Sequence, residues 1–116
     1  MVEREVHNDE TYLLDATGVA RLYAQPLGIV AKAITAKTNT VRRNPDSRAL
    51  QEGLAKLVDY FQRLYILMAE DETAVRRWFN RPNRALDGER PVELLAPGRL
   101  PELRSLIEQM EVGGHA

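Results

Sequence analysis

Apolar residues recur at three- and four-residue spacings along most of the chain, and no segment alternates apolar and polar residues over a useful length. Such spacing is typical of amphipathic helices, whereas half-buried strands need alternation. The longest stripe predicts a central helix of some twenty-odd residues, roughly 33 Å long. Its members are Leu50, Leu54, Leu57, Val58, Phe61, Leu64, Tyr65 and Met68. The pattern therefore predicts an all-α fold with this helix as its spine.

Local signals predict where the helices before and including the central one begin. Asp15 can cap a first helix that runs to about Tyr23, and Pro26 suits the first turn of a second. The polar stretch 35–39 leads into a third helix of one or two turns. Asn44-Pro45-Asp46-Ser47 offers a cap, a proline for the first helical position and an acid for the first turn of the central helix.

Turn signals punctuate the second half of the chain. Glu70-Asp71-Glu72 ends the central helix and caps the next one, Asp87-Gly88 predicts a turn, Pro91 begins a short helix and Pro101 opens the last helix. We therefore expect one compact unit with three parts. These are an acidic N-terminal arm at 1–14, a helix-turn-helix-like region at 15–46, and the central helix with a C-terminal helical unit at 47–116.

Composition narrows the class of protein. The 116 residues suit one compact domain, and 44% apolar with 28% charged residues is ordinary for a globular chain. No apolar run approaches the roughly 20 residues of a membrane helix, and the polar start Met1-Val2-Glu3-Arg4-Glu5 shows no secretory signal. We therefore expect a cytoplasmic protein with no membrane partner.

Catalytic and metal chemistry find little support in the residue types. The chain has no cysteine, which excludes disulfides, thiol catalysis and cysteine-ligated zinc, and its histidines, His7 and His115, both lie near the termini. Glu108 and Glu111 could share a helix face, but a solvated surface explains this pair better than an acid–base site. The sequence predicts no enzyme, no cofactor and no metal site.

Charge is unevenly distributed along the chain. Residues 1–15 hold five acidic residues and one basic residue, whereas residues 16–63 hold eight basic and three acidic residues. Clustered Lys and Arg can form a nucleic-acid face. From charge alone, however, a solvated helix face is the better explanation of the basic middle segment.

The third predicted helix carries polar residues that a major-groove reader requires. Asn and Arg can contact base edges, and Thr and Lys can hold phosphates. The candidate DNA-binding residues are Lys37, Thr38, Asn39, Thr40, Arg42 and Arg43. The usual glycine of a helix-turn-helix turn is missing, with Ala36 in its place. On these residues alone, DNA binding and a plain structural role both remain open.

A turn-rich pattern follows at 78–95. Each position has an architectural explanation, because Trp78 can anchor a helix end, Gly88 tolerates a positive φ and Pro91 can start a helix. The spacing itself reads Trp78-x-x-x-Pro82-Asn83-x-x-Leu86-x-Gly88-x-x-Pro91-x-x-Leu94-Leu95, followed by Gly98 and a terminal helix ending in Gly113. This pattern resembles the toxin-binding domain of the Xre/MbcA/ParS antitoxins over about residues 64–114. The helix-turn-helix-like region lies where that family carries its helix-turn-helix.

The resemblance implies an antitoxin of a bacterial type II toxin–antitoxin system. The partner that it implies is a RES-domain toxin, an enzyme that depletes NAD by hydrolysis or phosphorolysis. It also implies a heteromeric complex containing an antitoxin homodimer, and repression of the antitoxin's own operon through operator DNA. Such an antitoxin has no active site and neutralises by placing its C-terminal helix and tail over the NAD cleft of the toxin.

That occlusion maps onto the end of this chain. The residues assigned to toxin contact are Leu103, Ile107, Glu108, Met110, Glu111, Val112, Gly113 and Gly114. Acidic side chains there suit the basic groups of a site built for an anionic dinucleotide. A frayed acidic helix end is the alternative explanation.

Two other functions compete with the antitoxin hypothesis. One is a stand-alone helix-turn-helix transcriptional regulator that uses residues 16–43, and the other is a helical adaptor with an unrelated partner. The regulator predicts salt-dependent, sequence-selective DNA binding without a partner protein. The antitoxin predicts a stable heteromer with the product of a neighbouring gene.

Overall fold

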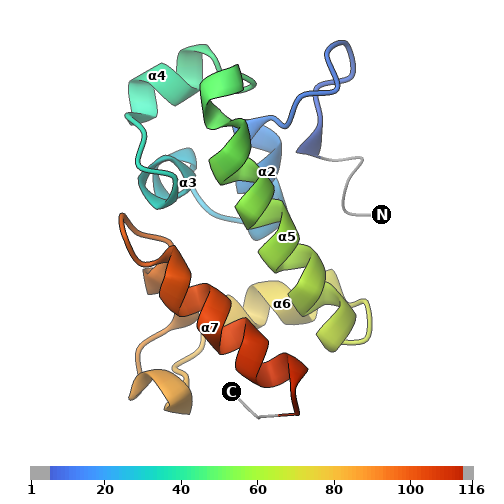
Figure 1. Ribbon diagram of the computed structural model, residues 1–116, viewed down its shortest axis with the longest axis vertical. Helices are drawn as coiled ribbons and strands as arrows, with labels where there is room; N and C mark the ends of the chain where they lie inside the picture. The colour runs from blue at the N-terminus through green and yellow to red at the C-terminus, as the bar shows by residue number, and fades with distance from the viewer. Residues whose placement is uncertain (1–5, 114–116) are drawn as a thin grey trace.

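The computed structural model describes residues 6–113 and is helical over most of that range (Figure 1). The elements are α2 (Ala16–Tyr23), α3 (Leu27–Ala33), α4 (Thr38–Arg43), η1 (Arg48–Leu50), α5 (Gln51–Leu67), α6 (Glu72–Phe79), η2 (Arg84–Leu86), η3 (Pro91–Leu94) and α7 (Leu100–Glu111). Extended pairing within the described residues is limited to an isolated bridge between His7 and Leu14. The predicted all-α class is confirmed.

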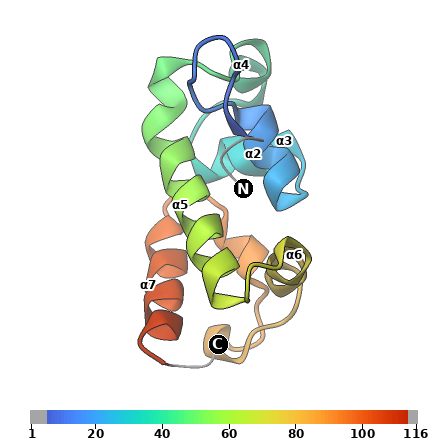
Figure 2. The same cartoon turned by 90° about the vertical axis from the view of Figure 1, so that its right-hand side faces the viewer.

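Helix α5 runs along the molecule and joins two groups of helices (Figures 1 and 2). Helices α2, α3 and α4 lie around its first half, and α6, η3 and α7 lie around its second half. None of the helices in residues 6–113 is long and apolar enough to cross a membrane. The central spine expected from the apolar stripe is therefore present.

Three aromatic rings join the two groups of helices. Tyr23, at the end of α2, packs against Phe61 of α5 and Phe79 of α6, with ring centroids 5.2 and 5.1 Å apart. All three side chains are fully or almost fully buried. The Tyr23 hydroxyl donates to the Leu57 carbonyl oxygen at 2.5 Å, so α2 is also tied to the backbone of α5.

A partly buried arginine makes a second connection between the groups. Arg76 Nε, from α6, donates to the Leu22 carbonyl oxygen near the end of α2 at 2.8 Å. The same guanidinium pairs with Glu72 one turn earlier at 2.9 Å and lies 5.9 Å from the centre of the Phe61 ring. The helix-turn-helix-like region and the C-terminal unit therefore share one core.

The helix starts predicted at Asp15, Asp71 and Pro91 are confirmed, and the predicted start of the central helix is wrong. Asp15 caps α2 and Asp71 caps α6 through their side chains. The central helix instead starts at η1, capped by the Ser47 hydroxyl, so Asn44-Pro45 do not begin it. The Pro45 carbonyl oxygen accepts a hydrogen bond from the Ala16 amide at 2.8 Å, so Pro45 is bonded to the start of α2.

The described part of the predicted acidic arm is packed onto the helices. Val6 is fully buried, and its carbonyl oxygen accepts a hydrogen bond from the Asp15 amide at 2.6 Å. The Gln51 side chain accepts from the Leu14 amide at 2.8 Å and donates to the Leu14 carbonyl oxygen at 2.9 Å. Residues 6–14 therefore contribute to the fold.

Candidate functional site

The turn-rich segment between α6 and α7 is organised around one buried polar residue. The Asn83 side chain is 6% exposed, and its Oδ1 accepts from the Ala85 amide at 2.9 Å. Its backbone amide donates to the Glu89 carbonyl oxygen at 3.0 Å, and its own carbonyl oxygen accepts from the Gly88 amide at 2.9 Å. Asp87 and Gly88 both have positive φ, 53° and 90°, as the turn prediction requires. Asn83 therefore holds the turn together through hydrogen bonds of its side chain and its backbone.

Most residues of the resemblance pattern build this support. Pro91, Leu94 and Leu95 are buried, and the Trp78 ring packs edge-on against Phe79 at 5.0 Å. Leu86 is half-buried against the same core, whereas Pro82 and Gly88 are exposed. Most residues of this pattern therefore pack in the core that supports α7, and few of them are exposed for contact with a partner.

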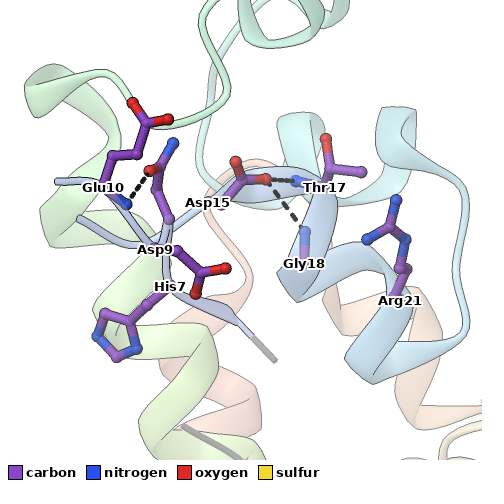
Figure 3. Close-up of a pocket in the computed structure, with 8 residues that line it drawn as sticks. His7, Asp9, Glu10, Asp15, Thr17, Gly18 and Arg21 are labelled. Atoms are coloured by element: carbon purple, nitrogen blue, oxygen red, sulfur yellow. Dashed lines mark hydrogen bonds between the residues drawn. The ribbon is translucent and has the colours of Figure 1, made fainter. Parts of the chain in front are cut away.

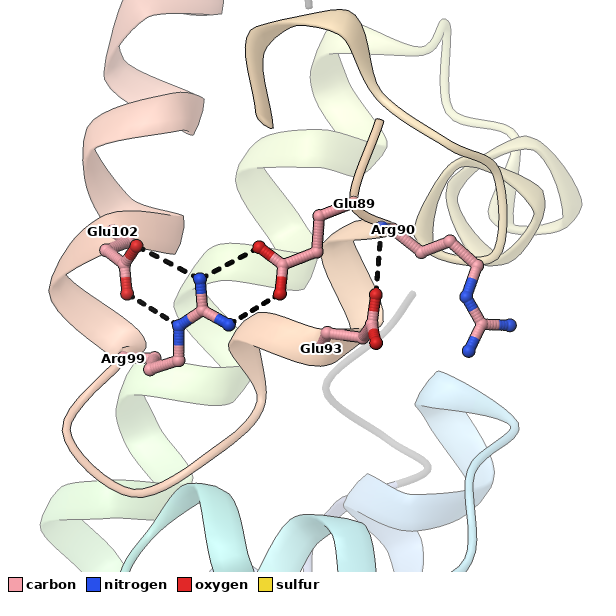
Figure 4. Close-up of polar contacts among 5 residues, drawn as sticks. All are labelled: Glu89, Arg90, Glu93, Arg99 and Glu102. Atoms are coloured by element: carbon pink, nitrogen blue, oxygen red, sulfur yellow. Dashed lines mark hydrogen bonds and ion pairs between the residues drawn. The ribbon is translucent and has the colours of Figure 1, made fainter. Parts of the chain in front are cut away.

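An ion-pair cluster attaches the turn to the start of α7 (Figure 4). Arg99 donates to both oxygens of Glu89, at 2.7 and 2.9 Å, and to both oxygens of Glu102, at 2.7 and 3.1 Å. These bonds lower the pKa values of both carboxyl groups. Arg90 is outside this cluster, since its side chain points away while its backbone amide donates to Glu93 at 3.2 Å.

Two of the predicted toxin-contact residues belong to the core of the chain itself. Leu103 and Ile107, on α7, have no exposed surface, and Met110 is half-buried against the same cluster. A partner could contact Leu103 or Ile107 only after α7 had moved. Their apolar character is accounted for by packing within the chain.

The exposed face at the end of α7 carries the remaining described candidates. Glu111 pairs with Arg63 of α5 through two bonds, Nε to Oε2 at 2.9 Å and Nη2 to Oε1 at 2.6 Å. Arg63 also pairs with Asp59 at 3.2 Å. Hydrogen bonding to Arg63 lowers the pKa of the Glu111 carboxyl group. The last turn of α7 is thereby attached to the last turns of α5.

Beyond this ion pair the chain is open to solvent. Val112 is 86% exposed, Gly113 follows with a positive φ of 96°, and Glu108 is exposed one turn earlier. Gly114, the last predicted contact residue, lies outside the described residues. The structure thus places Glu108, Glu111, Val112 and Gly113 together at one helix end.

Two exposed aliphatic residues were not among the predicted site residues. Ile66 is 62% exposed and Leu67 is 38% exposed, both in the last turn of α5. The sequence could have indicated their exposure, because neither residue belongs to the apolar stripe that defines the buried face of this helix. Large aliphatic residues off that stripe indicate either chance exposure or a contact surface.

The candidate DNA-binding residues lie on α4 and its approach. Lys37, Asn39, Thr40, Arg42 and Arg43 are exposed and Thr38 is half-buried, while Val41 anchors the helix in the core. The Arg42 guanidinium donates to Asn39 Oδ1 at 2.9 Å. The structure therefore gathers these side chains on one short helix.

The turn before α4 differs from the expectation in one detail. The backbone conformation that favours glycine is adopted by Thr35, with φ 57°, and not by Ala36. The Ala36 amide instead donates to the Ala31 carbonyl oxygen at 2.8 Å and closes the end of α3. The turn therefore forms without glycine because Thr35 takes the left-handed conformation.

The two predicted contact sets are far apart in the fold. Helix α4 lies at one end of α5, and the end of α7 lies at the other end in both views (Figures 1 and 2). One partner at each end would not compete for the same surface.

A separate polar pocket of about 570 Å³ lies beside the N-terminal segment (Figure 3). Its Asp15 carboxylate is used to cap α2, accepting from the amides of Thr17 and Gly18 at 2.8 and 3.2 Å. The pocket contains none of the predicted site residues. Residues 6–113 hold no group of three or more His, Asp or Glu side chains placed to bind a metal ion.

Comparison with known proteins relates the second half of the chain to one domain. Residues 63–113 match the model of the antitoxin Xre/MbcA/ParS C-terminal toxin-binding domain. The chain is also 35% identical over 100 residues to the probable mycobacterial cidal antitoxin Rv3188 of Mycobacterium tuberculosis. That similarity covers 78% of this chain and 84% of the relative. The matched domain begins at Arg63 and ends at Gly113, so it includes both partners of the Arg63–Glu111 pair.

Proposed function

This chain belongs to the Xre/MbcA/ParS antitoxin family, and on that basis we propose that its target is a RES-domain toxin that degrades NAD. The chain is an antitoxin of a toxin–antitoxin system, and its C-terminal domain binds the toxin. The finer identity of the target rests on the Trp78-to-Gly113 pattern, which is typical of partners of RES-domain toxins. In this role the antitoxin performs no catalysis of its own.

The proposed mechanism is occlusion of the NAD cleft by the end of α7. The observation that carries it is the 86% exposure of Val112 directly after the ion-paired Glu111. Because Leu103 and Ile107 pack in the core, α7 is held as a rigid support and only its end projects. A rigid projecting segment enters a cleft at a lower entropic cost than a disordered one.

The proposed contact residues fall into two groups. Glu108, Glu111, Val112, Gly113 and Gly114 would contact the toxin, whereas Leu103, Ile107 and the inner side of Met110 would position them. The carboxylates suit a cleft that binds an anionic dinucleotide, since such a cleft presents basic groups.

Co-purification with the product of the adjacent gene tests this function. We expect a stable complex with no NAD consumption, and NAD consumption once the toxin is released. Deleting residues 112–116 removes the exposed Val112 and everything after it, while leaving Leu103, Ile107 and the Arg63–Glu111 pair in the chain. We expect this variant to stay folded and to lose neutralisation.

Two results would contradict the proposal. If no partner co-purifies with the full chain, the assignment of the toxin is wrong. If the variant lacking 112–116 still protects cells that express the toxin, occlusion by the tail is wrong even though binding stands. The complex is further proposed to form in the cytoplasm, where NAD is held, and to contain an antitoxin homodimer, which its mass in solution would reveal.

A second role, repression of the antitoxin's own operon, is proposed for α4. It is supported by the exposed Lys37, Arg42 and Arg43 and by the position of α4 at the opposite end of α5 from the toxin-binding face. A short helix with exposed Arg and Asn fits recognition of base edges, and Lys and Thr fit phosphates.

DNA binding can be measured by fluorescence anisotropy with the DNA upstream of the operon. We expect Arg42→Ala/Arg43→Ala to weaken binding and to reduce its salt dependence, because each phosphate contact releases counterions. Arg84→Ala is the matched control, since Arg84 is exposed but lies in η2. Absence of binding by the wild-type chain at low salt would contradict this role. Binding without any toxin partner in the cell would favour the stand-alone regulator.

A further inference from the structure

Three of the large exposed apolar side chains in residues 6–113 come from the ends of α5 and α7. The large exposed apolar side chains of this range are Tyr12, Ile66, Leu67 and Val112, exposed by 81%, 62%, 38% and 86%. Single exposed apolar residues are normal on a protein surface, whereas grouped ones mark contact sites. All except Tyr12 lie within the matched toxin-binding domain.

The Arg63–Glu111 pair joins the last turns of α5 and α7, which carry Ile66, Leu67 and Glu111, the residue before Val112. Ile66 and Leu67 lie three and four positions after Arg63, so they occupy the same side of α5 one turn further on, about 5 Å along the axis. Val112 directly follows Glu111, which both bonds of Arg63 hold against α5. In both views the last turns of α5 and α7 lie at the same end of the molecule (Figures 1 and 2). We name Ile66, Leu67 and Val112 the α5–α7 end face.

The surroundings of this face are mainly acidic. Asp59, Glu70, Asp71 and Glu108 are exposed near the ends of α5 and α7, and Arg104 is an exposed base one turn before Glu108. The positive charge of Arg63 is used by Asp59 and Glu111, whose carboxylates it binds. A partner complementary to this end of the molecule would therefore present an apolar patch with basic residues around it.

We propose that the toxin docks on the α5–α7 end face, so that the last turn of α5 is part of the toxin-binding surface together with the end of α7. This inference rests on the proposed function, in that the partner is a toxin, and it adds the docking residues Ile66 and Leu67. The occupant is identified by continuity, because the face lies inside the domain whose family binds toxins. Arg63 acts as a positioning residue, because its bonds to Glu111 hold the last turn of α7 against α5.

Substitutions at Ile66 test the proposal with the co-purified toxin. Ile66→Gln removes the apolar surface with a good helix former, and Ile66→Glu and Ile66→Lys add charges of opposite sign. We expect Ile66→Gln to weaken toxin binding by about tenfold or more, as for other buried interface residues. A partner rim complementary to the exposed acids around this face is basic, so Ile66→Lys should weaken binding more than Ile66→Glu.

Tyr12→Gln and Tyr12→Lys are the matched controls, since Tyr12 is even more exposed but lies outside the matched domain. Urea unfolding of every variant establishes that the fold is retained. Unchanged toxin affinity in folded Ile66 variants would overturn the inference while leaving the antitoxin function intact. A wild-type chain that binds no toxin would instead overturn the proposed function. If the Ile66 variants lose self-association and keep full toxin affinity, a second copy occupies the face and the inference is wrong.

Discussion

At the scale of single residues, Gly53 fixes how closely α5 approaches the end of α3. A Cβ atom added at Gly53 would lie 2.7 Å from Ile34 Cγ2 and 2.8 Å from Ile34 Cβ. Ile34 Cβ is attached directly to the backbone, so it cannot move away by a change of rotamer alone. Gly28, in α3, differs because a Cβ there would meet only Thr38 Oγ1, at 3.7 Å.

We therefore expect Gly53→Ala to destabilise the protein although alanine is the better helix former. Overpacking costs about 1–3 kcal/mol, which outweighs a helix-propensity gain of about 1 kcal/mol. Gly28→Ala should be neutral or stabilising by up to about 1 kcal/mol, because it gains helix propensity without a close contact such as the one that Gly53→Ala makes with Ile34. Urea unfolding compares both variants with wild type, and equal stabilisation by the two would show that Ile34 does not restrict Gly53.

The sequence predicts a residue's conformation where that conformation depends on its immediate neighbours in the chain. It does not predict which surface a residue contacts where that depends on how the helices pack. The positive φ expected at Asp87-Gly88 is present, because a tight turn requires it whatever surrounds it. By contrast, an apolar stripe cannot say whether Leu103 and Ile107 face their own core or a partner, since both environments favour the same residues. The exposure of Ile66 likewise depends on which helices cover α5, and that information lies in distant parts of the chain.

At the scale of elements, the Arg99 cluster attaches the η2–η3 turn to the first turn of α7. One guanidinium binds Glu89 in the turn and Glu102 in the helix, so it holds two elements together. The pKa values of both carboxyl groups are lowered, first by hydrogen bonding to Arg99. A lowered carboxyl pKa contributes stability above the ordinary value of 4.5, and this contribution is lost as the pH falls through the lowered pKa.

Arg99→Gln should accordingly reduce the urea midpoint at neutral pH, and its difference from wild type should shrink as the pH falls through the lowered pKa values of Glu89 and Glu102. The cluster is partly solvated, so the effect at neutral pH should also shrink in high salt. Arg84→Gln is the control, as Arg84 is an exposed arginine with no ion pair among the described residues. A difference for Arg99→Gln that persisted unchanged at low pH would show that it acts through packing and not through charge.

Element boundaries illustrate the same division between local and long-range causes. Asp15 and Asp71 were predicted as caps because each side chain bonds amides within three residues of itself. The start of the central helix was misplaced by three residues or more because Pro45 and Asp46 bond distant partners. The Pro45 carbonyl oxygen accepts from Ala16, and Asp46 accepts from the Asn8 side chain at 2.9 Å. No local pattern could have shown those bonds.

At the scale of the whole molecule, the two groups of helices are coupled through Tyr23. Its ring fills the space between Phe61 and Phe79, and its hydroxyl donates to Leu57. Burial raises the pKa of this hydroxyl well above its ordinary value, so it remains protonated and keeps its role as donor at neutral pH. The two groups of helices therefore share one core.

This coupling predicts that the two ends unfold together. Tyr23→Ala removes a fully buried aromatic side chain and should cost about 3–5 kcal/mol, while Tyr23→Phe removes only the hydroxyl and should cost about 1 kcal/mol. Trp78, the single tryptophan, reports on the C-terminal half by fluorescence, and amide hydrogen exchange in α2 reports on the N-terminal half. Both probes should shift by the same free energy in each variant, because neither half can keep its core when the ring is gone.

Tyr12→Ala, at an exposed position, should shift neither probe. A Trp78 transition that stayed at its wild-type midpoint in Tyr23→Ala, while exchange in α2 accelerated, would show that the toxin-binding half folds independently and that the contacts of Tyr23 stabilise only the other half.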